Sequence, residues 1–373
     1  MNCFTTDVQK FLVHLESTHR VRTLKSPPGN LVDLCSNDYL CLSKDHRLTA
    51  ALKAGIDLYG AGSTASRLVS GHRDVFTQLE AAYAAWVGSE DGLFFANGYA
   101  ANVGSLSAIM DGSYAAFADR LSHASLMDGI RLSGARKVYF QHNDLNHLEE
   151  LLKKAPERRR MIVTESLFSM DGDFAPISDF VLLAQKYSAL LYVDDAHALG
   201  VYGNAGSGLS TGADFRVGTF GKALGLEGAV VATSALAKKY LLHTARTFVF
   251  STAPLPAIAH AALTAIGIVK GMDHERQELQ SVSAHIRSGI TGLGYLTCSS
   301  ASHIIPLLCA SEAEALSAAE ALLGVGYHVK AIRPPTVKQS RLRISVNAGI
   351  NAAASEKFLR ALDASLGTKV VHN

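Results

Sequence analysis

The chain has 373 residues, with 35 lysines and arginines against 33 aspartates and glutamates, which gives a net charge of +2. This balance excludes the strong positive field of a protein that binds polyanions, and the isolated basic run 158–160 is typical of a solvated helix end. The five cysteines include no Cys-x-x-Cys pair, so reduced thiols are favoured over a disulfide framework or a zinc site.

The length and the apolar segments also limit the class of protein. A chain of this size exceeds one ordinary domain and buries roughly three quarters of its unfolded surface, so we expect two domains. The first residues, Met1–Asp7, lack the basic start and apolar run of a signal peptide, and no apolar stretch reaches the roughly eighteen residues of a membrane span. We therefore expect a cytoplasmic protein.

The N-terminal region predicts an arm helix followed by a short strand. Apolar residues at helical spacing run through residues 6–23, with Asp7 early and Arg20 and Arg22 late, as the helix dipole favours. The segment Pro27-Pro28-Gly29 ends this helix, and residues 31–36 have the pattern of a strand.

A glycine run at residues 60–66 imitates a dinucleotide-binding fingerprint. That fingerprint requires a strand immediately before it, whereas residues 48–59 have the spacing of a helix. The context therefore argues against a Rossmann nucleotide site, although a nicotinamide-dependent dehydrogenase stays among the alternatives to be tested.

From residue 74 onward, helices and strands alternate. We predict helices at 74–86, 99–110, 125–133, 145–154 and 177–187, and strands at 92–95, 114–118, 137–140, 161–165, 190–193, 217–219 and 228–233. Repeated strand, crossover helix and strand units indicate a mostly parallel sheet with helices on both faces. The sequence thus predicts an α/β fold.

A long helical stretch from Pro256, interrupted near Gly271, leads to a smaller α+β unit at the C-terminal end. Its predicted elements are a strand at 304–308, a helix at 312–324, a strand at 342–346 and a helix at 353–366. We therefore expect an N-terminal arm at 1–45, a large domain at 46–275 and a small C-terminal domain at 276–373.

Two motifs at predicted strand ends carry the chemistry. An apolar run leads to Asp194, which is followed by His197, and a second short run leads to Thr219 and then to Lys222. Ligand sites in α/β sheets lie at the carboxyl ends of the strands. An amine beside a carboxylate and a histidine is the set of groups that pyridoxal phosphate (PLP) requires: Schiff-base lysine, pyridinium partner and ring contact.

Other residues suit the same site. Asn97, Gly98 and Tyr99 begin a predicted helix after a strand, where unpaired backbone N–H groups and the helix dipole favour a phosphate, and Thr219 adds a hydroxyl. Asp195 points away from Asp194 if the strand continues, so we expect it to be structural.

Six ordered motifs resemble the α-oxoamine synthase family of fold-type I PLP enzymes. They are Ser36–Leu40, Gly62–Arg67, Ser122–Ser125, Phe168–Gly172, Asp194–His197 and Thr219–Lys222. The resemblance runs from about residue 31 to residue 343 and so covers most of the chain. It implies a fold-type I architecture, a mostly parallel central sheet with a smaller α+β domain.

The resemblance implies a role for each matching residue. Lys222 forms the Schiff base and moves the α-proton, and Asp194 pairs with the pyridine nitrogen. His197 contacts the ring 3-oxygen and His123 stacks on the ring. Further matches contribute cofactor contacts (Ser169, and Thr252 toward the phosphate of the partner subunit) and substrate contacts (Asn37, and Arg341 for the amino-acid carboxylate).

The implied reaction is a decarboxylative condensation of an amino acid with an acyl thioester. Within the family, the chain is most similar to the members that join L-alanine to a pimeloyl thioester of coenzyme A or acyl carrier protein, as homodimers with shared sites. Family members that use glycine or serine, and an inactive relative with a structural role, are the alternatives. Departures from the common pattern at Ala198, Glu227 and Ile350 leave the cofactor chemistry intact but bear on the acyl partner.

Overall fold

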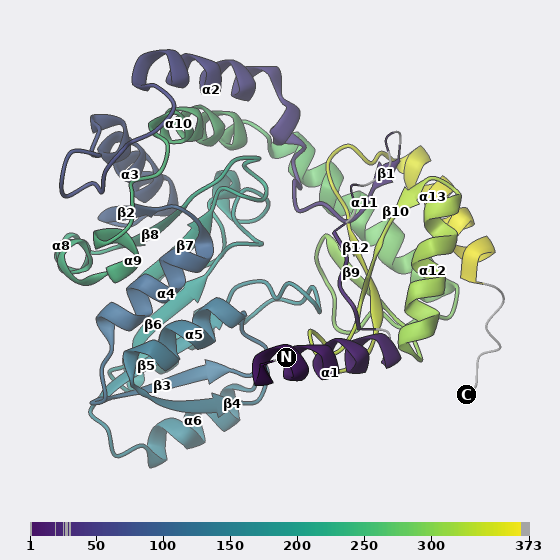
Figure 1. Ribbon diagram of the computed structural model, residues 1–373, viewed down its shortest axis with the longest axis horizontal. Coiled ribbons are helices and arrows are strands. Elements are labelled where there is room, and N and C mark those ends of the chain that lie inside the picture. The colour runs from purple at the N-terminus through teal and green to yellow at the C-terminus, as the bar shows by residue number, and fades with distance from the viewer. Residues whose placement is uncertain (1, 19, 25, 27–28, 30, 367–373) are drawn as a thin grey trace. The chain divides into compact units, whose positions relative to one another are not determined.

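The computed structural model describes residues 2–18, 20–24, 26, 29 and 31–366, and it forms two compact units (Figure 1). The larger unit comprises residues 37–168 and 174–277, and the smaller one comprises 1–36, 169–173 and 278–373. Pro27 and Pro28, which were expected to end the first helix, lie outside the described residues.

The larger unit is organised around a seven-stranded sheet. The strand order is β2 (Asp91–Phe95), β8 (Ala229–Thr233), β7 (Phe215–Thr219), β6 (Leu190–Asp194), β5 (Arg159–Glu165), β3 (Tyr114–Asp119) and β4 (Arg136–Phe140). The run from β7 to β4 is parallel, and β8 is antiparallel to both of its neighbours. The predicted mostly parallel sheet is confirmed.

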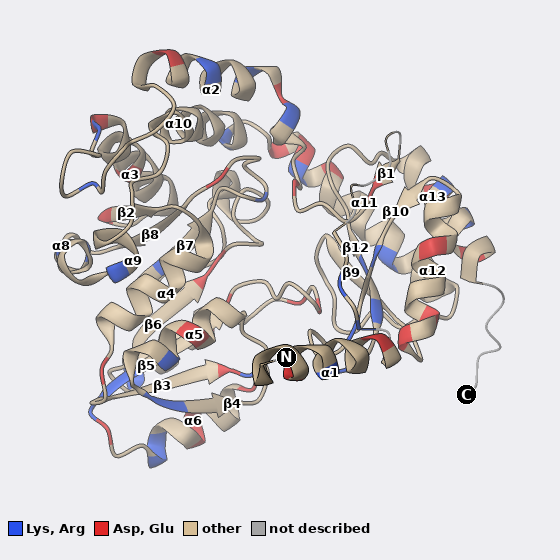
Figure 2. Ribbon diagram, viewed as in Figure 1, with Lys and Arg blue, Asp and Glu red and all other residues tan. Residues whose placement is uncertain are grey.

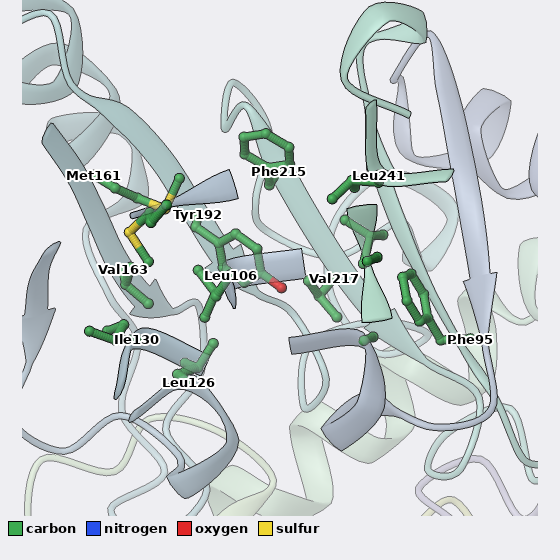
Figure 3. Packing of buried hydrophobic residues seen from close by; sticks show 14 of the residues in the cluster. Phe95, Leu106, Leu126, Ile130, Met161, Val163, Tyr192, Phe215, Val217 and Leu241 are labelled. Carbon is green, nitrogen blue, oxygen red and sulfur yellow. The ribbon is translucent and has the colours of Figure 1, made fainter. Parts of the chain in front are cut away.

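Alternating side chains of the strands divide the core into two layers. On one face, Met161, Val163, Tyr192 and Val217 pack with residues of four helices (Figure 3): α4 (Gly98–Ile109), α5 (Ala124–Ser133), α8 (Ala235–Thr244) and α9 (Arg246–Val249). On the other face, intervening residues such as Ile162 pack with α6 (Leu145–Lys154) and α7 (Ile177–Lys186). Each fully buried aliphatic or aromatic side chain stabilises the fold by about 1.5–3 kcal/mol.

The remaining helices of the larger unit pack against one another beside β2. They are η1 (Leu42–Lys44), α2 (His46–Tyr59), α3 (Asp74–Val87), η2 (Asn204–Gly206) and α10 (Pro256–Lys270), and α10 contacts both α2 and α3. A Cβ at Gly55 of α2 would lie 2.7 Å from the Ala257 Cα, so only glycine allows this approach. The glycine run at residues 60–66 follows α2, as the sequence predicted.

The smaller unit is an α+β assembly. A parallel pair joins β1 (Val32–Asp33) to β10 (Tyr327–His328), and an antiparallel sheet has the order β11 (Lys330–Ile332), β12 (Arg341–Ser345) and β9 (Ile304–Leu308). Its helices are α1 (Cys3–Ser17), α12 (Glu312–Gly324) and α13 (Ala352–Leu366). The chain passes between the units after residues 36, 168, 173 and 277, the last time within α11 (Asp273–Gly292).

Two local predictions at the N-terminal end are wrong. Helix α1 ends at Ser17, so Arg20 and Arg22 lie beyond it, and Arg20 instead pairs with Glu312 at 2.9 Å. The strand predicted at 31–36 shrinks to Val32–Asp33 because the Asp33 side chain accepts the backbone N–H groups of the next residues and turns the chain.

Charged residues are spread over both units. Lys and Arg are interspersed with Asp and Glu along the described ribbons of both units (Figure 2). Among the described residues, no helix combines the length and apolar character that crossing a membrane requires.

Candidate active site

The chemistry-bearing residues continue the apolar rows that build one layer of the core. Glu165 follows Val163 at a spacing of two along β5, and Asp194 follows Tyr192 in the same way on β6. Because strand side chains alternate between faces, both carboxyl groups emerge on the side of the sheet that carries α4 and α5. Thr219 completes this set at the end of β7.

Helices α4 and α5 begin beside these strand ends. The side chain of Asn97 caps α4 by accepting the Ala100 N–H at 2.8 Å. The first backbone N–H groups of the helix, those of Gly98 and Tyr99, have no intrahelical partners, as at any helix start. His123 caps α5. Two helix starts and three strand ends therefore converge on one edge of the sheet.

A cavity of about 260 Å³ occupies this edge, and all its lining residues belong to the larger unit. Eight of them were predicted as site residues from the sequence: Asn37, Gly98, Tyr99, His123, Asp194, His197, Thr219 and Lys222. The remaining lining residues are Asn102, Ser125, Glu165, Ala196 and Gly221. The motifs that lie up to 185 positions apart in the chain, from Asn37 to Lys222, thus line one cavity.

Asp194 is held in a fixed orientation at the cavity wall. It is 6% exposed, and its carboxylate accepts hydrogen bonds from the Asn102 Nδ2 at 2.6 Å and from the Ala196 N–H at 2.9 Å. Asn102 is fixed in turn, because its Oδ1 accepts the Tyr192 hydroxyl at 2.9 Å. The carboxylate is therefore oriented before any ligand binds.

His123 and Glu165 are joined through the backbone. The His123 N–H donates to the Glu165 Oε1 at 2.6 Å, and the His123 Nδ1 lies 2.8 Å from the Ser125 hydroxyl oxygen. Desolvation lowers the pKa of His123, the Asp194 carboxylate raises it and the Lys222 ammonium lowers it. The net direction is downward, which favours a neutral imidazole.

A hydrogen-bonded chain fixes His197, which is 7% exposed. The His197 Nδ1 lies 2.6 Å from the Tyr39 hydroxyl, and that hydroxyl donates to the Asn37 Oδ1 at 3.0 Å. The segment Asn37–Tyr39 therefore brings a predicted substrate residue and a predicted cofactor residue into one network.

Lys222 lies on a tight loop between β7 and β8. The Gly225 N–H donates to the Lys222 carbonyl at 2.9 Å, and the Phe220 N–H donates to the Gly228 carbonyl at 2.8 Å. Gly225 has a φ of +68°, and a Cβ there would lie 2.4 Å from the Ser43 nitrogen. The glycine is required for this close approach.

Asp195 is structural, as predicted from strand alternation. It is 2% exposed and accepts hydrogen bonds from the backbone N–H groups of Leu209 and Ser210, at 3.0 and 3.1 Å, and from the Ser210 hydroxyl at 2.6 Å. The Ser166 hydroxyl is a further donor.

Three predicted site residues do not line the cavity. Thr252 is exposed in the larger unit. Ser169 and Arg341 belong to the smaller unit. The Ser169 carbonyl accepts the Arg343 Nε at 2.6 Å.

Arg341 is buried and tightly held within its own unit. Its Nη1 donates to the Met170 carbonyl at 3.0 Å and to the Asp171 carboxylate at 2.6 Å, and its Nε donates to the Gln339 carbonyl at 3.2 Å. Among the described residues, its Nη2 has no hydrogen-bond partner. The planar guanidinium is thus oriented by three neighbours and keeps donor capacity for a carboxylate.

Asn102, Ser125 and Glu165 were missed as site residues, although signals for each were present. Asn102 lies four positions after Gly98 on the same helix and so shares its face. Ser125 belongs to the motif that contains His123. Glu165 ends a predicted strand in phase with the buried Met161 and Val163, as Asp194 does on the neighbouring strand.

Comparisons with known proteins agree on one family. Residues 29–362 match the family model described as aminotransferase class I and II. A curated 8-amino-7-oxononanoate synthase from Anaeromyxobacter dehalogenans is 44% identical over 344 residues, which cover 90% of this chain and 86% of that protein.

Solved structures are also similar. A serine palmitoyltransferase variant from S. paucimobilis with bound PLP and myriocin has a TM-score of 0.90 and 26% identity, and the match covers 98% of each chain. An 8-amino-7-oxononanoate synthase from Francisella tularensis has a TM-score of 0.80 and 27% identity, covering 91% of this chain and 98% of that one.

Proposed function

Because the chain belongs to the aminotransferase class I and II family, we propose that it is a PLP-dependent acyltransferase with the activity of an 8-amino-7-oxononanoate synthase. Its reaction joins L-alanine to a pimeloyl thioester and releases 8-amino-7-oxononanoate, carbon dioxide and the free thiol, a step of biotin biosynthesis. The observation that carries this proposal is the meeting of Lys222, Asp194, His197 and His123 in one cavity, together with the similarity to curated synthases.

The donor set of the cavity fits PLP. The N–H groups of Gly98 and Tyr99 at the start of α4, which have no intrahelical partner, and the Thr219 hydroxyl suit a phosphate dianion. A Cβ at Gly98 would lie 3.6 Å from the Thr219 Cβ, so these two phosphate-binding elements adjoin. Asp194 supplies the acid for the pyridine nitrogen, and His197 and His123 supply the contacts to the ring.

When bound, PLP supplies a cationic ring that stabilises negative charge at the α-carbon of the amino acid. Asp194 keeps that ring nitrogen protonated, since two opposite charges about 4 Å apart attract by roughly 4 kcal/mol at an effective dielectric near 20. The Lys222 amine anchors the cofactor and then removes and returns the α-proton, for which it must be neutral at its Nζ. Ser169 is proposed as a further cofactor contact.

Substrate recognition is proposed to use Arg341 and Asn37. The support for Arg341 is its oriented guanidinium, whose planar donor set matches the amino-acid carboxylate better than a lysine does. Asn37 is supported by its position in the cavity lining. Replacement of Arg341 by Lys is expected to raise the KM for L-alanine with a smaller change in kcat.

We also propose a cytoplasmic homodimer in which Thr252 reaches the phosphate bound by the partner subunit. Its exposed position outside the cavity of its own chain suits this role. The cysteines at 3, 35, 41, 298 and 309, all among the described residues, form no disulfide, as a reducing compartment favours. Light scattering with and without PLP tests the dimer.

The test of the proposed function is steady-state turnover across amino acids and thioesters. L-Alanine with pimeloyl-coenzyme A or pimeloyl-acyl carrier protein is expected to give the highest kcat/KM, measured against glycine and serine with acetyl, succinyl and palmitoyl thioesters. A preference for serine with a palmitoyl thioester would instead favour the serine palmitoyltransferases that the fold resembles. A visible absorption band that appears with PLP and shifts with L-alanine supports cofactor binding independently of turnover.

A further inference from the structure

Glu165 is a buried acid in the cavity that the proposed mechanism does not use. It is the last residue of β5, it is 4% exposed, and it lines the cavity. In the parallel pairing of β5 with β6, its register partner is Asp194. Two carboxyl groups therefore lie side by side on the same face of the sheet.

Among the described residues, only one carboxyl oxygen of Glu165 takes part in a hydrogen bond. Its Oε1 accepts the His123 N–H at 2.6 Å, whereas its second oxygen has no hydrogen-bond partner among the described residues. A protonated carboxyl has one O–H donor and keeps an acceptor on the other oxygen. With the proton on the second oxygen, both the bond to His123 and a donor for a ligand are available.

Burial and the neighbouring carboxylates favour the neutral form of Glu165. The groups that act on Glu165 are the carboxylates of Asp194 and Asp119, the Lys222 ammonium and the His123 N–H. Burial is the largest cause and raises the pKa of Glu165 well above its usual range, Asp194 raises it further, and Lys222 and the His123 N–H lower it. The net direction is strongly upward, chiefly because burial penalises the ionised carboxylate and also because the Asp194 carboxylate lies beside it.

We propose that Glu165 occupies the cavity as a neutral carboxylic acid whose second oxygen donates an O–H hydrogen bond to a carbonyl or carboxylate oxygen of the bound substrate. The inference rests on the proposed function for the identity of the substrate, but not for the protonation of Glu165. A neutral donor adds no second negative charge beside Asp194, and it stabilises negative charge that develops on an oxygen in a water-poor site.

The protonation is tested on the apoprotein by infrared difference spectroscopy between the natural chain and Glu165→Gln. We expect a carbonyl band of a protonated carboxyl at pH 7 that is lost in the variant and that disappears from the natural chain only at alkaline pH. A difference spectrum that shows only carboxylate bands at pH 7 would overturn the proposal. This readout does not depend on PLP or on any substrate.

The hydrogen bond is tested by a matched pair of variants. Glu165→Gln keeps an N–H donor and an acceptor for His123, so its kcat/KM with L-alanine and the pimeloyl thioester is expected within about threefold of the natural chain. Glu165→Leu has neither, and a loss of about 100-fold is expected, as for other donors to a developing oxyanion. Equal losses in both variants would contradict the proposal.

Two measurements separate loss of the Glu165 hydrogen bond from loss of folding or of PLP binding. Thermal unfolding and PLP binding of each variant show whether Glu165→Leu is folded and loaded, and Glu165→Gln stays informative if it is not. Absence of turnover by the natural chain with every thioester tested would defeat the proposed function. In that case the infrared band and the spectral Kd for L-alanine, compared between the two variants, still decide the role of Glu165.

Discussion

At the end of β6, the polar groups on the two faces of the sheet differ in where their hydrogen-bond partners come from. Toward α4 and α5, Asp194 and Glu165 face a cavity and keep part of their hydrogen-bonding capacity for a ligand. Toward the opposite side, Asp195 is surrounded by donors from Ser166, Leu209 and Ser210. Asp194 and Asp195 are adjacent in the chain, yet only one faces the cavity.

This difference assigns a role in ligand binding to Asp194 and a role in stability to its neighbour Asp195. A carboxylate whose donors all come from the protein holds loops together, and its loss leaves those donors buried without partners. A carboxylate on the cavity side is oriented by few bonds, and its loss mainly affects the ligand. Substitutions on the two sides should therefore affect different measurements.

The largest expected effect comes from Lys222→Ala on the cavity side. Removal of the amine eliminates the proposed covalent anchor and base, so kcat should fall by about 10⁴-fold or more, as for the nucleophile of other enzymes. Turnover of L-alanine with the pimeloyl thioester measures this loss. Borohydride treatment followed by mass spectrometry should fix PLP on the natural chain and not on the variant.

Asp194→Asn is expected to cause the second-largest loss of activity, although the side chain hardly changes in shape. Loss of the proposed attraction of about 4 kcal/mol between the carboxylate and the ring cation corresponds to roughly 10³-fold in rate. The variant should unfold at nearly the same temperature as the natural chain. A variant with more than a tenth of natural activity would contradict the assignment of Asp194 to the ring nitrogen.

Asp195→Asn should show the opposite pattern. The amide nitrogen of Asn would face the N–H and O–H donors of Leu209 and Ser210, so the free energy of unfolding should fall by about 3 kcal/mol. Urea denaturation measures this change. Activity per folded molecule at low temperature should stay within a few-fold of the natural value, and a loss as large as that of Asp194→Asn would remove the distinction between the two sides.

The sequence predicted the cavity side well because its signals are local. Apolar runs that end at Asp194 and Thr219 mark carboxyl ends of buried strands, and parallel strands bring those ends together. Eight predicted residues line one cavity, although Asn37 and His123 among them were predicted from the family resemblance and not from strand ends. Glu165 was missed although it has the same phase as Asp194, because no motif drew attention to it.

Other features could not be predicted because they depend on side-chain hydrogen bonds or on distant pairing. The strand at 31–36 stops early because Asp33 bonds to the backbone that follows it. Strands β10 and β11 have only two and three residues, too few for a period to be recognised. Helix α1 ends before Arg20, whose partner Glu312 lies 292 positions away.

Protonation of His123, on the cavity side, should have a smaller effect on stability than the Asp195 substitution, and its sign can be predicted. Because its folded pKa is lowered, the imidazole should take up a proton only below the usual value of about 6.5. Below about pH 6.5 the unfolded chain takes up a proton on His123 before the native state does. The neutral imidazole therefore leaves stability unaffected above that pH, and stability is lost as the pH falls from there through the lowered folded pKa.

Two variants should move the His123 titration in opposite directions. Asp194→Asn removes the carboxylate that raises the pKa and should lower the midpoint further, whereas Lys222→Ala removes the cation that lowers it and should raise the midpoint. Proton NMR of the histidine ring in the apoprotein measures both. Shifts in the same direction in the two variants would show that Asp194 and Lys222 do not act on His123 by charge.

The smallest expected effect tests how far the orientation of Asp194 depends on the core behind it. The Tyr192 hydroxyl donates to the Asn102 Oδ1 at 2.9 Å and lies 2.7 Å from the Ser105 hydroxyl oxygen. Tyr192→Phe leaves the Asn102 oxygen without this donor, at a cost of about 1 kcal/mol in stability, and lets Asn102 hold Asp194 less firmly. We expect kcat to fall less than tenfold, with a measurable coupling to Ser105→Ala in a double-mutant cycle.

Tyr187→Phe is the matched control for this last change, because its hydroxyl donates to Glu149 at 2.8 Å on the layer of α6 and α7. Its removal should change neither kcat nor the cofactor spectrum, since no cavity residue depends on it, and the partly exposed bond contributes little to stability. Equal effects of the two Tyr→Phe substitutions on kcat would mean that the hydroxyl network behind Asp194 does not orient the cavity residues. The contrast between the two faces of the sheet would then be limited to the residues that line the cavity.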